Sequence, residues 1–481
     1  MRVLFCAAEC APFVKTGGLG DVVAALPRSL LAQGVGVRVL MPKYRDAFAE
    51  IGATETVARF DALMGGPATV QAVRADGLEL LLLDAPHLFD RPGNPYVQAD
   101  GSDWPDNHLR FGALAHVAAA VATGTLDGDW RADAVHAHDW HAGLVPLYLS
   151  MQGAGAPPSM MTIHNIMYQG LFPGEVRAEL GLPEQGFTPD GYEFHGQVGF
   201  LKAGLMYANK VSTVSPTYAE EIKTAAFGLG LEGVINHRGG DVVGILNGID
   251  QEVWDPATDP LINSHYKAPN VKARAANRRQ LNTRFGLTPG DGPLMCVVSR
   301  LTEQKGLDLL LNALPDFIKA GGKLALLGSG DRVMQQGFED AALAYPSDVG
   351  TVIGYDEALA HQLQAGSDAI IVPSRFEPCG LTQMYGLRYG CLPIVAHTGG
   401  LADTVTDCDT GPNHGTGFVF TPVTQAALSD ALMRAIACFA DAPRWRGVMR
   451  RAMKQDLSWD ASAATYIDIY GAIRADTGVA A

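Results

Sequence analysis

The sequence predicts an α/β fold built from two doubly wound, Rossmann-like domains that face each other across a deep cleft. Short, continuous apolar segments alternate with helix-like segments in two successive series of similar length. This pattern is typical of parallel strands that are buried on both faces. The segments end in loops rich in Gly, Lys, Arg, His, Asp and Glu. Two such domains facing one another would bring these loops together.

Chain length and composition limit the classes of function. The 481 residues allow two or three domains, and contents of 47% hydrophobic and 18% charged residues are those of an ordinary globular protein. A formal net charge of −15 argues against a nucleic-acid partner, because proteins that bind the phosphate backbone carry a basic surface. A small anionic ligand remains compatible, since a few local cations suffice to bind it.

Cysteine usage and hydropathy predict a soluble, cytoplasmic protein without a membrane partner. The seven cysteines are scattered and include no CxxC pair, which is typical of reduced thiols in the cytosol. The apolar run at the N-terminus is interrupted by Glu9, so it is too short for a signal peptide. No apolar run approaches the roughly 20 residues that a membrane-spanning helix needs.

The first series is predicted to form a domain over residues 1–245. Residues 42–77 are expected to be irregular, and a strand is expected to end within residues 134–141. The other predicted strands cover residues 2–8, 35–41, 78–83, 160–163, 210–215 and 241–246, and helices are predicted over residues 22–31 and 111–122. The polar, proline-punctuated stretch at 255–260 follows the boundary.

A glycine-rich loop, residues 15–21 (KTGGLGD), follows the first predicted strand. Glycines let backbone N–H groups approach a phosphate, and Lys15 adds a positive charge. Lys15 and the N–H group of Gly18 are therefore candidate phosphate contacts, and a merely tight turn is the alternative. The spacing matches neither the Walker A motif nor the dinucleotide-binding fingerprint.

Polar side chains also follow two later strands. Residues 134–141 contain three histidines and Asp139, and residues 160–165 end in His164 and Asn165. Metal binding is one interpretation, but no second acidic cluster with metal-like spacing accompanies the histidines. Doubly wound sheets bind ligands outside the carboxyl ends of their strands. Asp139 and His164 are therefore the candidates here, with a structural role as the alternative for the histidine.

Residues 96–111 mix aromatic rings, amides and charges without a clear period at their start. Sugars are often held by flat rings together with polar groups. Tyr96, Trp104 and Asn107 are therefore candidates for binding a sugar. A structured loop that caps the following helix explains the same residues equally well.

The second series is predicted over residues 246–456, and a C-terminal amphipathic helix lies within residues 457–481. Arg300 and Lys305 place two cations in a strand-to-helix loop, which favours an anion. Tyr355 ends another strand, and its ring could stack on a base. The predicted strands cover residues 293–299, 323–327, 351–355 and 370–372, and the predicted helices cover 307–314, 426–439, 443–453 and 459–474.

The loop that carries Glu377 is the centre of the second series. An apolar strand runs into residues 373–380, and a helix is predicted to begin near Leu381 and Thr382. The loop therefore combines a carboxylate with a helix start, whose unpaired N–H groups and positive dipole end can hold an anion. Cys379 lies beside Glu377; a nucleophilic thiol is the less favoured interpretation, because a small residue also packs well there.

The chain resembles the bacterial glycogen synthase and plant starch synthase family over nearly its whole length. The resemblance is carried by six motifs: residues 15–22 (KTGGLGDV), 136–141 (HAHDWH), 162–165 (TIHN), 247–250 (NGID), 299–306 (SRLTEQKG) and 373–382 (PSRFEPCGLT).

The resemblance implies a GT-B glycosyltransferase. Such an enzyme moves glucose from ADP-glucose to the non-reducing 4-OH of an α-1,4-glucan, such as glycogen, with retention of configuration and release of ADP. It also implies that no metal or other cofactor is required, and that the C-terminal helix crosses back onto the first domain. Oligomeric state cannot be derived from these residues.

Roles follow for the candidate residues under this resemblance. Arg300 and Lys305 would stabilise the leaving pyrophosphate, helped by N–H groups of the loops. Glu377 would bind the donor sugar and stabilise its positive charge. Asp139 and His164 complete the expected catalytic residues: His164 would contact the donor sugar, and Asp139 would bind sugar or acceptor or help to remove the acceptor proton. The expected donor contacts are Lys15, Gly18, Asn247, Tyr355, Cys379, Gly380, Leu381 and Thr382, and the expected acceptor contacts are Tyr96, Trp104 and Asn107.

Two mechanisms stay open for the transfer. Front-side attack, with the leaving phosphate taking the proton, is preferred; double displacement would need Asp139 as the carboxylate on the opposite face of the sugar. Many retaining GT-B enzymes carry a second glutamate eight positions after the first, where this chain has Tyr385. No role can therefore be transferred from that second glutamate.

Three other functions compete with this one: a GT-B transferase that uses UDP-glucose or another acceptor, a nicotinamide dehydrogenase, and a non-catalytic glucan-binding protein. The dehydrogenase lacks the glycine fingerprint followed by an acidic residue. The presence of Lys15, Arg300, Lys305 and Glu377 argues against a binding protein without catalysis.

Overall fold

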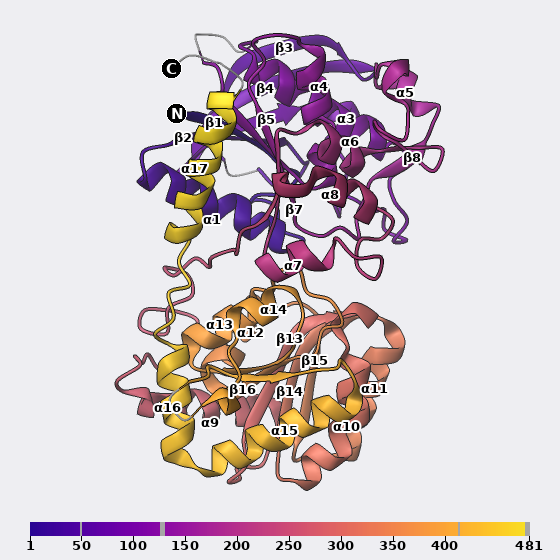
Figure 1. Cartoon of the computed structure of the whole chain (residues 1–481). Coiled ribbons are helices and arrows are strands. Elements are labelled where there is room, and N and C mark those ends of the chain that lie inside the picture. The colour runs from indigo at the N-terminus through magenta and orange to yellow at the C-terminus, as the bar shows by residue number, and fades with distance from the viewer. Residues whose placement is uncertain (49–50, 126–129, 412–413, 477–481) are drawn as a thin grey trace. The chain divides into compact units, whose positions relative to one another are not determined.

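The computed structural model describes residues 1–48, 51–125, 130–411 and 414–476. The chain forms two compact units (Figure 1). Unit 1 comprises Met1–Gly248 together with the C-terminal segment from Trp459, and unit 2 comprises Ile249–Ser458. Within the described ranges, no helix is long and apolar enough to cross a membrane. Both units are Rossmann-like α/β structures built on a largely parallel sheet, as the sequence predicts.

The main sheet of unit 1 is parallel from β12 to β5. Its described strands lie in the order β12 (Val242–Gly244), β11 (Lys210–Thr213), β7 (Ser159–Ile163), β6 (Ala134–His138), β1 (Arg2–Cys6), β2 (Gly36–Pro42), β5 (Leu78–Asp84), β4 (Gly66–Ala75) and β3 (Glu55–Leu63). Strand order reverses between β1 and β6, so these two strands flank the topological switch point, where doubly wound sheets bind ligands.

The prediction of an irregular stretch between β2 and β5 is wrong. Strands β3 and β4 form an antiparallel hairpin that extends the sheet beyond β5. Met64 and Gly65 make its turn, both with positive φ. Both strands are only partly buried and mix polar with apolar residues. They therefore lack the continuous apolar run by which the buried parallel strands were recognised.

The helices of unit 1 include α17 (Asp460–Asp476), which contacts α1 (Gly18–Ala32) and β6 of the same unit. Ser29 on α1 donates to the Asp460 carboxylate over 3.1 Å, and the Tyr470 hydroxyl lies 2.7 Å from His136 Nδ1 on β6. Figure 1 shows α17 alongside α1. The other helices are α1 (Gly18–Ala32), α2 (Pro86–Phe89), α3 (Asn107–Ala122), α4 (Val145–Met151), α5 (Val176–Glu179), α6 (Phe200–Tyr207), α7 (Pro216–Glu221) and α8 (Glu232–Arg238). A small antiparallel sheet contains β8 (Leu171–Pro173), β10 (Gln197–Gly199) and β9 (Glu193–Phe194).

The sheet of unit 2 is parallel throughout its described strands. They lie in the order β15 (Val349–Ile353), β14 (Lys323–Gly330), β13 (Leu294–Leu301), β16 (Ala369–Val372), β17 (Leu392–Ala396) and β18 (Phe418–Phe420). Numbered from β13, this is the order 3-2-1-4-5-6 of dinucleotide-binding sheets, with its switch point between β13 and β16. The helices are α9 (Arg274–Phe285), α10 (Leu307–Lys319), α11 (Arg332–Ala344), α12 (Glu357–Gly366), α13 (Thr382–Tyr389), α14 (Gly399–Thr404), α15 (Gln425–Ala440) and α16 (Ala442–Ala452).

Candidate functional site

The switch point of unit 2 brings Glu377 and Lys305 together. Glu377 follows β16, Lys305 follows β13, and Lys305 Nζ lies 2.6 Å from Glu377 Oε2. The same oxygen accepts a hydrogen bond of 2.8 Å from the Ser374 hydroxyl. Glu377 is only 6% exposed, and a buried carboxylate is costly unless it is paired and hydrogen-bonded. Both conditions are met, so this carboxylate is held in a fixed position.

Arg300 lies near the carboxyl end of β13, the strand that Lys305 follows, and it forms no ion pair with Glu377. Strand β13 extends to Leu301, beyond the predicted end, so Arg300 belongs to the strand and not to the following loop. Its side chain is exposed and forms no ion pair with any described residue. An exposed guanidinium without a carboxylate partner remains available to an anionic ligand.

Gln383 fixes the backbone of the Glu377 loop, although it is not among the residues predicted from the sequence. This fully buried side chain donates from Nε2 to the carbonyl oxygens of Cys379 and Gly380, over 3.0 and 2.9 Å. Gly380 has φ +71°, and a Cβ there would lie 2.4 Å from Gln383 Oε1. A polar residue in the first turn of a helix that follows such a loop is the signal that could have indicated this role.

The remaining candidates of unit 2 lie around the same loop or at its sheet. Leu381 is the N-cap of α13, Thr382 is its first residue, and no side chain caps that helix start. Cys379 is buried within the loop. Tyr355 follows β15; its side chain is 78% exposed, and its hydroxyl donates to Glu357 over 2.5 Å. Its ring therefore faces solvent, as a stacking platform requires.

Tyr385, eight positions after Glu377, has a packing role. Its ring stacks on Trp254 with centroids 3.7 Å apart and an angle of 8° between the planes. The opposite face of Trp254 stacks on His361, also at 3.7 Å. This stack packs α13 against the first residues of unit 2. An aromatic ring therefore suits residue 385 better than a carboxylate would.

In unit 1, the glycine-rich loop follows β1 and leads into α1. Gly18 is the first residue of α1, and Gly17 precedes it in an extended conformation without a side-chain cap. Lys15 is exposed, and its Nζ lies 3.0 Å from the Asp21 carboxylate. The backbone N–H and the hydroxyl of Thr16 in this loop donate to the carboxylate of Glu9, a buried residue that is not among those predicted from the sequence.

Asp139 occupies a strained position directly after β6. Its φ is +55°, which is uncommon for a residue other than glycine and is typical of functional sites. Its Oδ1 accepts from the backbone N–H of His164 over 2.7 Å. Burial raises the pKa of Asp139 to about 7, and the Glu9 carboxylate adds to this rise, while the hydrogen bonds from His164 and Asn165 oppose it.

Asp139 is followed in the fold by a cluster of histidines, of which His136, His138 and His141 are buried and His164 is partly buried. His138 Nδ1 is 3.0 Å from His164 Nε2, and His136 bonds to Thr162 and Tyr470. Burial lowers the pKa of His164 to about 3. Among the residues that the structure describes, no group of three or more His, Cys, Asp or Glu side chains is arranged to hold a metal ion. His164 thus lies beside Asp139 as a neutral imidazole.

Asn247 lies after β12, at the end of unit 1. Its side chain is buried, and its Oδ1 has no hydrogen-bond partner among the described residues. Buried polar atoms without a partner are rare in folded proteins, and a ligand is one cause of such an atom. This geometry is consistent with the predicted contact to a sugar hydroxyl.

The predicted acceptor residues separate into two kinds. Tyr96 stacks on His141 with centroids 4.5 Å apart and donates its hydroxyl to Glu9, so it belongs to the switch-point cluster. Trp104 is partly exposed beneath the Arg91 guanidinium. Asn107 is buried, donates to the Tyr96 carbonyl over 3.0 Å and accepts from Arg110 over 2.6 Å. Asn107 therefore supports the Tyr96 loop instead of facing solvent.

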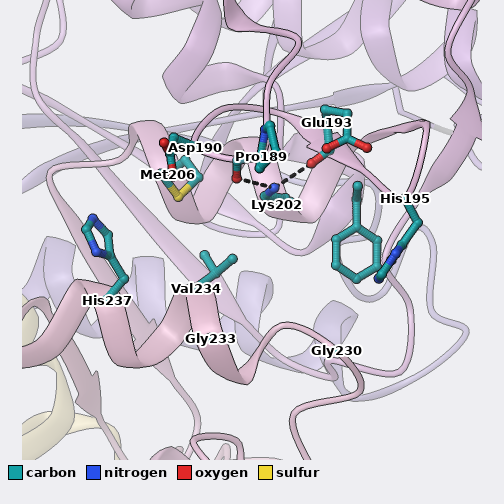
Figure 2. A pocket seen from close by; sticks show the side chains of 11 residues that line it. Pro189, Asp190, Glu193, His195, Lys202, Met206, Gly230, Gly233, Val234 and His237 are labelled. Carbon is teal, nitrogen blue, oxygen red and sulfur yellow. Dashed lines mark hydrogen bonds between the residues drawn. The ribbon is translucent and has the colours of Figure 1, made fainter.

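A cavity of about 540 Å³ in unit 1 contains none of the predicted residues (Figure 2). It lies between the small sheet and helices α6 and α8. Lys202 Nζ donates to the carbonyl oxygens of Pro189, over 2.6 Å, and of Glu193. Burial lowers the pKa of Lys202. The Lys202 ammonium thus stabilises the 189–193 loop through hydrogen bonds to its backbone. In this it differs from Lys15 of the glycine-rich loop, whose side chain is exposed.

Comparison with known proteins decides the family. Residues 2–237 match the family model described as starch synthase catalytic domain, and residues 279–446 match glycosyl transferases group 1. A glycogen synthase of Roseobacter denitrificans is 54% identical over 98% of this chain and 99% of its own length. The chain belongs to the glycogen synthase family. Members from Rhodopseudomonas palustris and Rhizobium meliloti share 51% and 48% identity, over 98% and 99% of this chain.

Solved structures agree with this family. The catalytic domain of starch synthase IV from Arabidopsis thaliana, bound to ADP and acarbose, has a TM-score of 0.87 and 33% identity over 98% of this chain and 99% of its own. Sucrose-phosphate synthase from Thermosynechococcus elongatus has a TM-score of 0.63 at 19% identity, with 99% of each chain covered, and shows the shared fold only. The glycogen synthase family thus accounts for the GT-B class and for glycosyl transfer as the kind of reaction.

Proposed function

We propose that the protein is a glycogen synthase that transfers glucose from ADP-glucose to the non-reducing 4-OH of an α-1,4-glucan, with retention of configuration and release of ADP. The observation that carries this proposal is the switch point of unit 2. There, the carboxyl ends of β13 and β16 carry a fixed Lys305–Glu377 pair, Arg300 without an ion pair among the described residues, and the start of α13 without a side-chain cap. The related plant starch synthase is bound to ADP and acarbose, which supports a nucleotide and a glucan as ligands.

The chemistry follows from the charges that develop in the transition state. Breaking the bond between glucose and phosphate builds negative charge on the pyrophosphate and positive charge on the sugar. Arg300 and Lys305 would stabilise the leaving group. Lys305 can do so while it is paired, because only one of its three N–H groups donates to Glu377. Glu377 would accept hydrogen bonds from sugar hydroxyls and stabilise the positive charge. We infer that these groups would suffice without a metal ion, and we therefore expect full activity in the presence of EDTA.

The proton of the acceptor hydroxyl must leave during transfer. We propose that the departing phosphate takes it during front-side attack. Asp139, with its pKa near 7, would orient the sugars and not form a covalent bond. If mass spectrometry identified a glucosyl adduct on Asp139, trapped in a slowed enzyme, front-side attack would be refuted in favour of double displacement.

A direct assay tests the proposal. Purified protein is incubated with a glycogen primer and either ADP-glucose or UDP-glucose, with and without EDTA, and release of ADP or UDP is measured. We expect ADP release that depends on the primer, and chain extension of the glucan. Nucleotide release only from UDP-glucose would mean that UDP-glucose, and not ADP-glucose, is the donor. No release from either donor would refute the proposed function.

A further inference from the structure

We propose that Glu9 is a positioning residue for glucosyl transfer, which holds the glycine-rich loop and Tyr96 in one fixed arrangement. Glu9 follows β1 at the switch point of unit 1 and is only 3% exposed. The inference rests on the proposed function, because that function gives the loop a role toward the donor and Tyr96 a role toward the glucan.

The two carboxylate oxygens of Glu9 have separate tasks. Oε2 accepts the backbone N–H groups of Thr16 and Gly17, over 2.6 and 3.3 Å. Oε1 accepts the hydroxyl groups of Thr16 and Tyr96, both over 2.5 Å. One oxygen therefore fixes the backbone of the loop, and the other links that loop to the ring of Tyr96.

The charge of Glu9 is buried without a cation. Among the described residues, no Lys, Arg or His forms an ion pair with it, and the four hydrogen bonds alone offset its desolvation. An apolar side chain would fill the same space at lower cost, so the carboxylate serves the geometry of its neighbours. Its direct partners are Thr16, Gly17 and Tyr96. Through them it acts on Lys15, which directly precedes Thr16, and on His141, on which Tyr96 stacks.

Glutamine is the conservative substitution that this geometry tolerates. Its amide oxygen can replace Oε2 and accept both N–H groups, and its NH₂ group can donate to the hydroxyl oxygens of Thr16 and Tyr96, which accept as well as donate. Glu9→Ala removes all four bonds. We expect Glu9→Ala to lower kcat/KM by at least about tenfold, with higher KM for both ADP-glucose and glucan, and Glu9→Gln to stay within about threefold of the wild type.

Two further variants separate the two tasks. Thr16→Val removes one loop bond and should raise the KM for ADP-glucose, whereas Tyr96→Phe should raise the KM for the glucan. Glu193→Ala is the matched control: its carboxylate accepts the Gly196 N–H over 2.5 Å at the cavity of Figure 2, in the same unit. We expect both KM values of this control to be unchanged.

Several outcomes would overturn the proposal. Equal loss in Glu9→Gln and Glu9→Ala would mean that the negative charge itself takes part in the reaction. A Glu9→Ala protein with lower thermal stability but wild-type KM values would mean a structural role only. If Glu9→Ala fails to fold, unchanged KM values in both Thr16→Val and Tyr96→Phe refute the positioning role. Failure of the proposed function is distinguishable, because the wild type would then release no nucleotide.

Discussion

At the residue scale, the structure makes Lys305 the partner of Glu377 and gives Arg300 no ion-pair partner in the part of the chain that it describes. Two cations that look equivalent in the sequence therefore have different tasks before any ligand binds. Lys305 compensates the charge of a buried carboxylate, while Arg300 remains available to an anion.

Replacement of Lys305 tests this division of tasks. Lys305→Ala removes a leaving-group donor and leaves the Glu377 carboxylate buried with only the Ser374 bond, so we expect kcat to fall by about a hundredfold or more. Steady-state kinetics of ADP release measure this, with Lys319→Ala, an exposed lysine on α10, as control. A loss confined to the KM for ADP-glucose would contradict a role in the transition state.

The pKa of Asp139, about 7, predicts the acidic limb of the activity profile. Below that pH the carboxyl is protonated and loses its negative charge, so we expect kcat/KM to fall with falling pH below about 7. In Asp139→Asn, the profile should be low but flat in this range, because the titrating group is gone. The measurement is kcat/KM for ADP-glucose across this range; an unchanged acidic limb in Asp139→Asn would assign the limb to another group.

At the element scale, the loops after β13 and β16 approach each other closely at a glycine. Gly306 precedes α10 with φ +63°, and a Cβ there would lie 2.1 Å from the carbonyl oxygen of Pro373. Because Pro373 begins the Glu377 loop, a side chain at residue 306 would displace that loop. The motif at residues 299–306 thus contributes this contact as well as its cations.

Two glycine substitutions separate backbone strain from this close approach. Gly286 has nearly the same conformation, φ +69°, but a Cβ there meets nothing within 4 Å. We expect Gly286→Ala to cost about 1 kcal/mol of unfolding free energy, with normal activity. Gly306→Ala should cost more and lower kcat by about tenfold through displacement of the loop. Urea denaturation and ADP release measure both effects, and equal activities would exclude the displacement.

At the scale of the whole molecule, the buried histidines make stability depend on pH. Burial lowers the pKa of His141 and His164 to about 3, from an ordinary value of 6.5, and the pKa of His136 and His138 falls well below its ordinary value. Between the two values the unfolded chain binds more protons, so stability falls as the pH falls below about 6.5. Asp139 acts in the opposite direction, but one carboxyl opposes four imidazoles.

We therefore expect the free energy of unfolding to fall below pH 6.5 by about 1 kcal/mol per pH unit for each of these histidines. Urea denaturation at several pH values measures the slope. His237→Gln changes an exposed histidine on α8 and should leave the slope unchanged. A stability that is constant as the pH falls from about 6.5 to 5 would mean that these imidazoles are not buried in the folded protein.

The amino-acid sequence by itself determined the alternation of buried strands with helices, because continuous apolar runs are recognisable without knowledge of their neighbours. It also placed Glu377, Asp139 and the glycine-rich loop at strand ends. Only the tertiary structure decided how these groups pair. The partner of Glu377 is 72 residues away in the chain, and Glu9 meets Tyr96 at a separation of 87. Such contacts depend on the order of the strands in the sheet, so they leave no local pattern in the sequence. The same holds for the half-buried β3–β4 hairpin, because its pairing depends on the neighbouring strand β5.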